Sequence, residues 1–205
     1  MDFIIDFFIN SYSETSFTMI LLEFTAFVFG IVSVVYAQKE NILVFPTGII
    51  CTVITVYILF DAQYFGDMMM NLYYSSMSIY GWWNWTRLKN DNSTIEITYT
   101  SFNERIIALV LFILTIIVTY TVYIFNITTI ELVNYIDIFT SGIFFVAMWF
   151  MANKKIENWI FWIIGDLITI PLYSYRGLGM LSIQYLIFTI LAIQGYNKWK
   201  KSLAK

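Results

Sequence analysis

The chain has 205 residues, of which 60% are hydrophobic and only 12% are charged. A soluble domain of this composition would expose far too much apolar surface, so the sequence indicates an integral membrane protein. Its 11 basic and 14 acidic residues give a net charge of -3, with no basic patch for nucleic acid. The single cysteine, Cys51, and the lack of histidine argue against a disulfide framework and a metal site.

Seven apolar runs follow one another along the chain, and a helix needs about 20 such residues to cross a bilayer. The runs cover residues 17–37, 42–60, 68–85, 106–125, 130–152, 159–175 and 179–198. We interpret the short apolar stretch 2–8 as an interfacial segment, since it lacks the features of a signal peptide. The longest polar connection, residues 88–104, is expected to be a cytoplasmic loop. The sequence thus predicts an all-α membrane protein with one domain, residues 1–205.

Two stretches of the chain resemble each other. Asn41 and Asn158 each open an apolar stretch, and Gly81 and Gly195 each begin the aromatic end of that stretch. The asparagines lie 117 positions apart and the glycines 114. Two similar halves in a very hydrophobic chain are typical of transporters built from repeats, with a substrate site between the halves.

Each repeat is predicted to hold three helices, at residues 17–85 and 130–199, with a linker helix at 106–125 between them. The linker helix restores the direction of the chain, so both repeats have the same orientation in the membrane. A pseudo-twofold axis then runs along the membrane normal. The expected architecture is a 3+1+3, SWEET-like arrangement of seven transmembrane helices.

The distribution of basic residues predicts the orientation. With seven spans, every Lys and Arg except Arg176 falls on one side of the membrane. Basic loops stay in the cytoplasm during insertion. We therefore expect the N-terminus outside and the C-terminus inside.

The strongest chemical signal is a row on the sixth predicted helix. Asn158, Trp162 and Asp166 are spaced four residues apart and share one face. A carboxylate in the bilayer costs about 2.5–3.5 kcal/mol, so Asp166 should face a wet cavity or a partner. An amide, an indole and an anion together suit a cationic heteroaromatic solute. In the first repeat we align Phe45 and Ile49 with the Trp and the Asp, so only one half supplies this recognition face.

A structural interpretation of the same row stays open. Asn158 can cap its helix, Trp162 can belong to an interfacial aromatic belt, and Asp166 can pair with a neighbouring helix. Two further acids, Glu23 and Asp137, lie near the outer ends of the first helices of the repeats, at positions that this alignment does not make equivalent. Each is a candidate for cation or proton binding, or for a structural hydrogen bond.

Three amides and two tryptophans complete the candidate set. Asn71 and Gln184 lie on the third helix of each half, where an amide can bind a solute hydroxyl or join two helices. Gln63 lies in the outer loop and is a weaker candidate. Trp82 and Trp83 fall at the cytoplasmic interface, where we expect membrane anchoring first and gating second.

Several of these motifs resemble the PnuC family of bacterial vitamin facilitators. They are residues 157–162 (Glu-Asn-Trp-Ile-Phe-Trp), residues 177–185, which end in Gln-Tyr, and residues 80–82 (Tyr-Gly-Trp). Glu23 and Asp137 also match the family pattern. The resemblance covers almost the whole chain.

The resemblance implies a homotrimer in the bacterial cytoplasmic (inner) membrane. It implies facilitated diffusion of nicotinamide riboside, which a cytoplasmic kinase then traps by phosphorylation. The substrate would lie between the repeats, held by Asn158, Trp162 and Gln184, and no resident cofactor is expected.

Asp166 departs from the family pattern, because some riboside-transporting members have a neutral amide there. Thiamine, like nicotinamide riboside, has a cationic ring that suits an anion beside an indole, whereas riboflavin is neutral and larger. The chain has no GxxxxGK[ST] loop, so we expect uniport without ATP hydrolysis. A membrane-embedded enzyme with Asp166 as base and a scaffold subunit are the rival classes.

Overall fold

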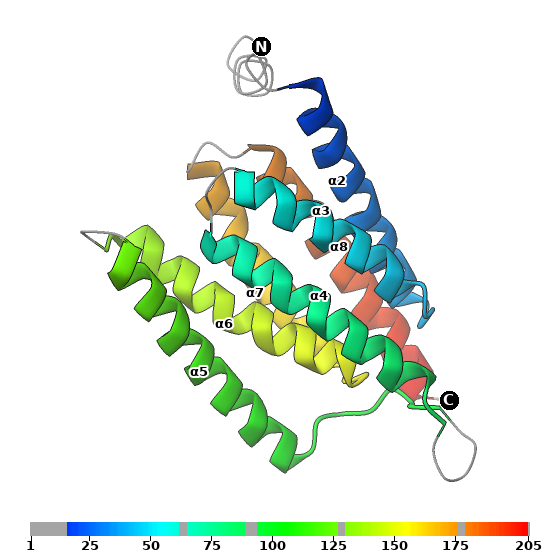
Figure 1. Cartoon of the computed structure of the whole chain (residues 1–205). Helices are drawn as coiled ribbons and strands as arrows, with labels where there is room; N and C mark the ends of the chain where they lie inside the picture. The colour runs from blue at the N-terminus through cyan, green and yellow to red at the C-terminus, as the bar shows by residue number, and fades with distance from the viewer. Residues whose placement is uncertain (1–15, 62–64, 89–93, 127–129, 176–178, 205) are drawn as a thin grey trace.

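The computed structural model describes residues 16–61, 65–88, 94–126, 130–175 and 179–204. Seven α-helices lie in these ranges (Figure 1): α2 (Phe17–Gln38), α3 (Val44–Asp61), α4 (Phe65–Thr86), α5 (Phe102–Asn126), α6 (Leu132–Ala152), α7 (Asn158–Tyr175) and α8 (Gly179–Leu203). The seven predicted helices are confirmed. The largest change is at the end of α8, which runs to Leu203 rather than Lys198. The interfacial segment 2–8, Gln63 and Arg176 lie outside the described residues.

Four of the described helices, α2, α3, α5 and α6, are long and apolar enough to cross a membrane by themselves. The other three, α4, α7 and α8, carry more Asn, Ser, Tyr and Trp residues. Several of these polar and aromatic side chains line the cavity described below. The lower hydropathy of α4, α7 and α8 therefore comes in part from polar and aromatic side chains that face the cavity.

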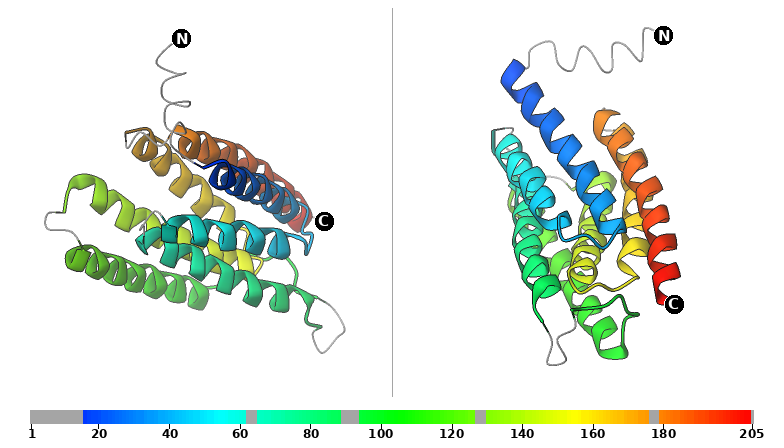
Figure 2. Two further views of the ribbon diagram at one scale, coloured as in Figure 1. Left: turned by 45° about the horizontal axis from the view of Figure 1, so that its top comes forward. Right: turned by 90° about the vertical axis from the view of Figure 1, so that its right-hand side faces the viewer.

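Six helices pack as a closed ring. In order around the ring, α2 contacts α3, α3 contacts α4, α4 contacts α6, α6 contacts α7, α7 contacts α8, and α8 contacts α2. The extensive contacts of α5 are with α6, and α5 lies on the outside of the ring (Figures 1 and 2). The ring has two seams between the halves of the chain, α4 against α6 and α2 against α8.

The two halves repeat at one constant spacing. The starts of α3 and α7, at Val44 and Asn158, are 114 positions apart. The turns that precede them carry positive φ angles of 53° at Glu40 and 51° at Lys154, again 114 positions apart. Left-handed backbone is uncommon for residues other than glycine, so its recurrence marks equivalent turns.

The spacing of 117 inferred from the two asparagines is therefore wrong. The side chains of Asn41 and Asn158 have different local roles: the Asn41 Oδ1 accepts from the Leu43 amide at 2.9 Å, whereas the Asn158 Nδ2 donates to the Lys155 carbonyl at 2.6 Å. Asn41 lies in the turn before α3 and Asn158 is the first residue of α7, so they sit three positions apart in the repeat. Residue type alone could not reveal this shift.

The corrected spacing changes which residues correspond. Glu23 and Asp137 are equivalent after all, since they are 114 positions apart. The counterpart of Trp162 is Gly48 rather than Phe45, and the counterpart of Asp166 is Thr52 rather than Ile49. The two halves are thus more alike in the positions of their acids than the sequence comparison suggested. They are less alike at the position of Trp162, where the first half has a glycine.

Both seams are closed at the same end of the bundle, which we call the Lys-rich end. Here α2, α4, α6 and α8 end, and this end carries Lys39, Arg87, Arg105, Lys154, Lys155, Lys198, Lys200 and Lys201. In one seam the Asn84 Nδ2 donates to the Ala152 carbonyl at 2.9 Å. In the other, the Trp199 Nε1 donates to the Ala37 carbonyl at 3.0 Å. Each bond joins the third helix of one half to the last turn of the first helix of the other.

A glycine lies beside each bond and lets an aromatic ring approach its helix. A Cβ added to Gly81 would lie 2.3 Å from the Phe45 ring, and one added to Gly195 would lie 2.6 Å from the Trp159 ring. Phe45 and Trp159 are themselves 114 positions apart. The repeated glycines therefore serve close packing at equivalent places of the two halves.

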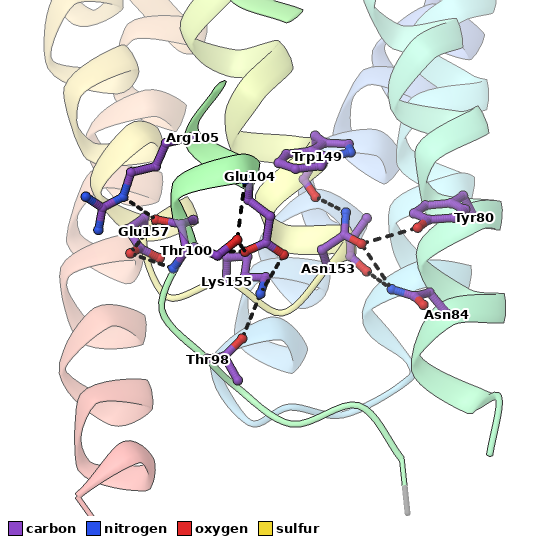
Figure 3. A network of polar contacts seen from close by, with 12 residues as sticks. Tyr80, Asn84, Thr98, Thr100, Glu104, Arg105, Trp149, Asn153, Lys155 and Glu157 are labelled. Atoms are coloured by element: carbon purple, nitrogen blue, oxygen red, sulfur yellow. Dashed lines mark hydrogen bonds and ion pairs between the residues drawn. The ribbon is translucent and has the colours of Figure 1, made fainter. Parts of the chain in front are cut away.

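Residues 94–101, which we call the strap, cross the Lys-rich end beneath the turn between α6 and α7 (Figure 3). The Thr98 amide donates to the Lys154 carbonyl at 3.2 Å, and the Ile156 amide donates to the Thr98 carbonyl at 3.1 Å. The Thr100 amide and hydroxyl both donate to one Glu157 oxygen, at 2.9 and 2.8 Å. The predicted polar loop is thus partly ordered against the second half of the chain.

Helix α5 is anchored to the second half at both of its ends. At the Lys-rich end, the Lys155 Nζ lies 2.8 Å from the Glu104 Oε1 (Figure 3). At the opposite end, the Tyr123 hydroxyl donates to Asp137 on α6. These contacts make α5 part of the same packed unit as α6 and α7.

The glycine contacts predict a stability effect. Gly81→Ala and Gly195→Ala should each destabilise the fold by about 1–3 kcal/mol, because the added methyl overlaps a buried ring that has no room to move. A chain of this size loses about 2–4 °C of Tm per kcal/mol, so thermal unfolding of the purified protein should begin several degrees lower. Ser76→Ala, on the exposed face of α4, is the control and should leave Tm unchanged. Unchanged Tm values in both glycine variants would contradict the packing described.

Candidate functional site

A cavity of about 770 Å³ lies inside the ring. Its lining residues come from all six helices of the ring and none comes from α5. Most of the lining residues form pairs 114 positions apart, such as Glu23 with Asp137, and Asn71 with Tyr185. The cavity is therefore built from equivalent surfaces of the two halves that face each other.

One face of α7 forms a wall of this cavity. Its lining residues are Trp159, Trp162, Asp166, Thr169 and Tyr173, at alternating spacings of three and four residues. This is the spacing of one helix face over four turns. The predicted row is thus confirmed as cavity-facing for Trp162 and Asp166, while Trp159 lines the cavity where Asn158 was expected.

Asp166 is buried in the wall of the cavity. Its side chain is 2% exposed. Among the described residues, no group donates a hydrogen bond to its carboxyl or pairs with it. A buried anion is costly unless a cation or several donors compensate it. The carboxyl is thus available to a ligand in the cavity, and the internal ion pair considered from the sequence is absent from the described part.

Aromatic rings surround Trp162. Its ring centroid lies 5.6 Å from that of Phe144 on α6 and 6.2 Å from that of Tyr74 on α4. Phe144 in turn lies 5.9 Å from Tyr185 on α8. The Trp162 Nε1 is buried and has no acceptor in the described part of the chain. Rings from four helices and a carboxylate in one cavity form a setting in which a cationic ring can bind.

The charge of the cavity is uniformly acidic. Glu23, Asp137 and Asp166 line it, and in the described ranges no Lys or Arg does so. Asp137 also accepts a hydrogen bond from Tyr123 of α5. A wall with acids and no bases favours cations and repels anions.

The two predicted amides also reach the cavity. Asn71 lines it from α4 and Gln184 from α8. The Gln184 Nε2 lies 3.6 Å from the point where a Cβ of Gly30 would stand, so the amide reaches across to α2. The described residues offer the Gln184 side chain no hydrogen bond. It is a second polar group free to meet a ligand.

Three other candidates lie elsewhere. The Asn158 side chain is fully buried at the start of α7 and is not among the lining residues. Trp82 and Trp83 are exposed at the Lys-rich end, and the Trp83 ring lies 4.6 Å beneath the Arg87 guanidinium. That position agrees with anchoring at a membrane interface.

Sequence reasoning missed several lining residues. Tyr74 and Phe144 are of aromatic types that commonly pack between helices, and Ser78 is of a small type that is common where membrane helices meet, so their identity gave no signal. The spacing of two of them did give a signal, since Tyr74 and Ser78 follow Asn71 on α4 at steps of three and four residues and so share its helix face. Reading this face together with the corrected repeat would have indicated them.

Between the cavity and the Lys-rich surface lie two contacts between equivalent residues. The rings of Trp85 and Trp199, buried and 114 positions apart, have centroids 6.2 Å apart. Beyond them, the Lys154 Nζ lies 3.6 Å from the Glu40 Oε2, and these residues are also 114 positions apart. Burial lowers the pKa of Lys154, and Glu40 partly offsets this effect. The cavity is thus closed toward the Lys-rich end.

Comparison with known proteins identifies the family. The model of the nicotinamide mononucleotide transporter family matches residues 20–201. The chain belongs to this family. It is 22% identical over 204 residues to the nicotinamide riboside transporter PnuC of Escherichia coli strain K12. The alignment covers 88% of this chain and 85% of the relative. The protein of the same name from Shigella flexneri matches equally.

The fold also matches a solved structure. The crystal structure of the vitamin B3 transporter PnuC aligns with a TM-score of 0.71 over 97% of this chain and 85% of that one, at 19% identity. At this identity the match concerns the fold alone. The family and the apolar helices together identify this chain as a transmembrane transporter, as the sequence predicted.

The acidic lining predicts charge-selective chemistry at Cys51, which lines the cavity from α3. A cationic methanethiosulfonate reagent should modify Cys51 at least about tenfold faster than an anionic one, because the carboxylates concentrate cations in the cavity. Intact-protein mass spectrometry gives both rates. The control is Thr121→Cys in a Cys51→Ala background, exposed on α5, where the two rates should be similar. Equal rates at Cys51 would contradict an acidic cavity.

Proposed function

We propose that this protein transports nicotinamide riboside. The observation that carries the proposal is the cavity, in which the unpaired carboxyl of Asp166 shares a wall with Trp162 and no Lys or Arg is among the described lining residues. Nicotinamide riboside carries a cationic pyridinium ring, and an anion beside an aromatic face attracts such a ring. The relatives that bear the name nicotinamide riboside transporter support the same substrate.

Each candidate residue has a distinct role in this proposal. Trp162 stacks on the pyridinium ring and Asp166 balances its charge. Gln184 and Asn71 hydrogen-bond the carboxamide or the sugar. Asn158 meets the substrate only when the Lys-rich end opens, because its Oδ1 is buried and lacks a donor in the described part of the chain.

The charge of the cavity also separates the riboside from the mononucleotide after which the family model is described. A mononucleotide adds a phosphate group of nearly two negative charges at neutral pH. Placing it near Glu23, Asp137 and Asp166 costs several kcal/mol through like-charge repulsion. The riboside is therefore the better substrate.

The same repulsion supports trapping after entry. Once a cytoplasmic kinase phosphorylates the riboside, the product is an anion that the acidic cavity rejects. The kinase needs no physical contact with the transporter. The net direction of uptake then follows from phosphorylation rather than from an energy source in this chain.

Thiamine is the alternative substrate, because it too has a cationic ring that Asp166 and Trp162 can bind. A membrane-embedded enzyme with Asp166 as base is a remote alternative. The named relatives are transporters, which favours transport over catalysis.

The proposed mechanism is uniport by rocking of two halves related by a pseudo-twofold axis, in a 3+1+3, SWEET-like arrangement of seven transmembrane helices. The constant spacing of 114 supports this arrangement, and so does the head-to-tail order around the ring, in which α2, α3 and α4 are followed by α6, α7 and α8. Contacts between equivalent residues must lie near such an axis. Trp85 with Trp199, and Glu40 with Lys154, are such contacts, so we propose that they form the inner gate.

In the membrane, we propose that the Lys-rich end faces the cytoplasm of a bacterial inner membrane, with the N-terminus outside and the C-terminus inside. The clustering of Lys and Arg at that end supports this orientation. We also propose a homotrimer. The wide apolar face that α5 exposes, with Ile106, Leu109, Ile113 and Ile117, offers a surface for lipid or a second copy.

Binding of nicotinamide riboside to the purified protein tests the function. Asp166→Asn and Trp162→Ala should each weaken binding by at least about tenfold, since each removes an interaction with a desolvated cation. Isothermal calorimetry with nicotinamide riboside, nicotinamide mononucleotide and thiamine gives the three affinities. Riboside should bind tightest and mononucleotide weakest.

The control is Thr86→Ala, at the exposed end of α4 and outside the cavity, which should bind like the unmodified protein. Binding of thiamine alone would keep the site and change the substrate. Absence of binding by all three compounds, in protein that unfolds cooperatively, would overturn the proposal.

Uniport predicts that transport needs no ion gradient. Because the riboside is a cation, the membrane potential is held at zero in this test. Riboside added outside proteoliposomes should then equilibrate across the membrane at the same rate with or without a sodium or proton gradient, since no second solute must move. Uptake of radiolabelled riboside measures the rate, with empty liposomes as control. Accumulation above the outside concentration, driven by either gradient, would rule out plain uniport.

A further inference from the structure

The wall of the cavity opposite α7 has its own chemistry. Gly48 on α3 is the position equivalent to Trp162, so the first half leaves space where the second half has an indole. A Cβ added to Gly48 would lie 3.1 Å from the Ser33 Oγ and 3.7 Å from the Ser78 Oγ. Hydroxyls from α2 and α4 thus converge on a bare stretch of α3.

Ser78 has a hydroxyl that nothing in the described part of the protein binds. Its side chain is 4% exposed, and it lines the cavity. The other hydroxyls of this wall are partly engaged. Ser33 donates to the Val44 carbonyl at 2.8 Å. Thr52 donates to the Gly48 carbonyl at 3.0 Å and its Oγ1 lies 2.7 Å from the Ser75 Oγ, within hydrogen-bond distance. Burying a hydroxyl without a partner is costly, so Ser78 is poised for a ligand that can hydrogen-bond.

The equivalent positions in the second half are apolar. Ala147 and Ala192 occupy the places that correspond to Ser33 and Ser78. At these three equivalent positions, the first half therefore has a hydroxyl, a glycine without a side chain, and a hydroxyl. The second half has a methyl group, an indole and a methyl group. A ligand that fits both walls must be apolar and aromatic on one side and rich in hydrogen-bonding groups on the other.

The two walls are close enough for one small molecule. Tyr74 on α4 lies within 6.2 Å of the Trp162 ring, centroid to centroid. Ser78 follows Tyr74 by one helical turn, about 6 Å nearer the Lys-rich end. A ring stacked on Trp162 would thus place a substituent about one turn deeper, beside Ser78.

We infer that Ser33, Thr52 and Ser78, arranged around Gly48, form a subsite for the vicinal hydroxyls of a sugar joined to the cationic ring. This inference rests on the proposed function and deepens it, since it assigns sugar recognition to the first half of the chain. These three side chains are neutral, so they select by hydrogen bonding rather than by charge. The ligand class is an N-ribosylated aromatic cation, and a cation without a diol lacks these contacts.

The test compares nicotinamide riboside with its 2′,3′-dideoxy analogue, which keeps the charged ring and lacks the diol. Calorimetry on the purified full chain gives the ratio of the two dissociation constants. The unmodified protein should prefer the riboside by about tenfold or more, because the analogue leaves buried hydroxyls unpaired. Ser78→Ala should lose most of that preference by weakening riboside binding alone.

Gly48→Ala provides a second variant that adds a methyl instead of removing a hydroxyl. The methyl would fill the space beside Ser33, so the preference for the riboside should fall here too. Ser76→Ala is the matched control: it lies two residues from Ser78 on the exposed side of α4, where its hydroxyl donates to the Leu72 carbonyl. Both affinities should be unchanged in this control.

Three results would overturn the subsite. They are an unmodified protein that binds both compounds equally, a Ser78→Ala variant that keeps the full preference, and a variant that loses affinity for both compounds alike. Absence of binding by either compound would instead overturn the proposed function. The preference ratio thus tells the two failures apart, and a cooperative thermal transition in each variant shows that it has folded.

Discussion

Closure of the six-helix ring at the Lys-rich end is the constraint on which the rest of this structure depends. Each seam is held by a side-chain N–H that donates to the last turn of a helix in the other half, from Asn84 to Ala152 and from Trp199 to Ala37. Helix ends leave carbonyls without intrahelical partners. The bond from Asn84 satisfies the Ala152 carbonyl, whereas the Ala37 carbonyl also accepts from the Glu40 amide and gains a second donor in Trp199. Both bonds join the halves, and the cavity exists because the ring is shut below it.

Between this closed end and the opposite end, the two halves have equivalent backbones but different side chains at several cavity-lining positions. Glu23 and Asp137 are both acidic at equivalent positions, whereas Thr52 is the counterpart of Asp166 and Gly48 is the counterpart of Trp162. A symmetric cavity would bind a small asymmetric solute in two orientations. In the proposed transporter, the difference between the walls favours one orientation of the substrate.

The sequence was enough to predict the seven helices, because each is a long apolar run bounded by polar residues. It also revealed Trp162 and Asp166, since a carboxylate in a span is expensive and thus conspicuous. It failed on the register of the repeat, because Asn41 and Asn158 look alike but bond to different backbone groups. It could not reveal Ser78 or Phe144, because both residue types are common where membrane helices pack together and their importance comes from the neighbours that only the fold supplies.

The peripheral position of α5 has a consequence for how freely its sequence can change. In the proposed arrangement, three membrane crossings leave the chain on the opposite side of the membrane. One more crossing is needed before the second three-helix repeat can begin on the same side as the first. Helix α5 supplies that crossing without contributing to the cavity. Helix α5 packs against α6 and is attached to Asp137 and Lys155. Its outer face is turned away from the cavity, so apolar residues there can replace one another by neutral drift as long as the surface offered to lipid or a second copy stays apolar.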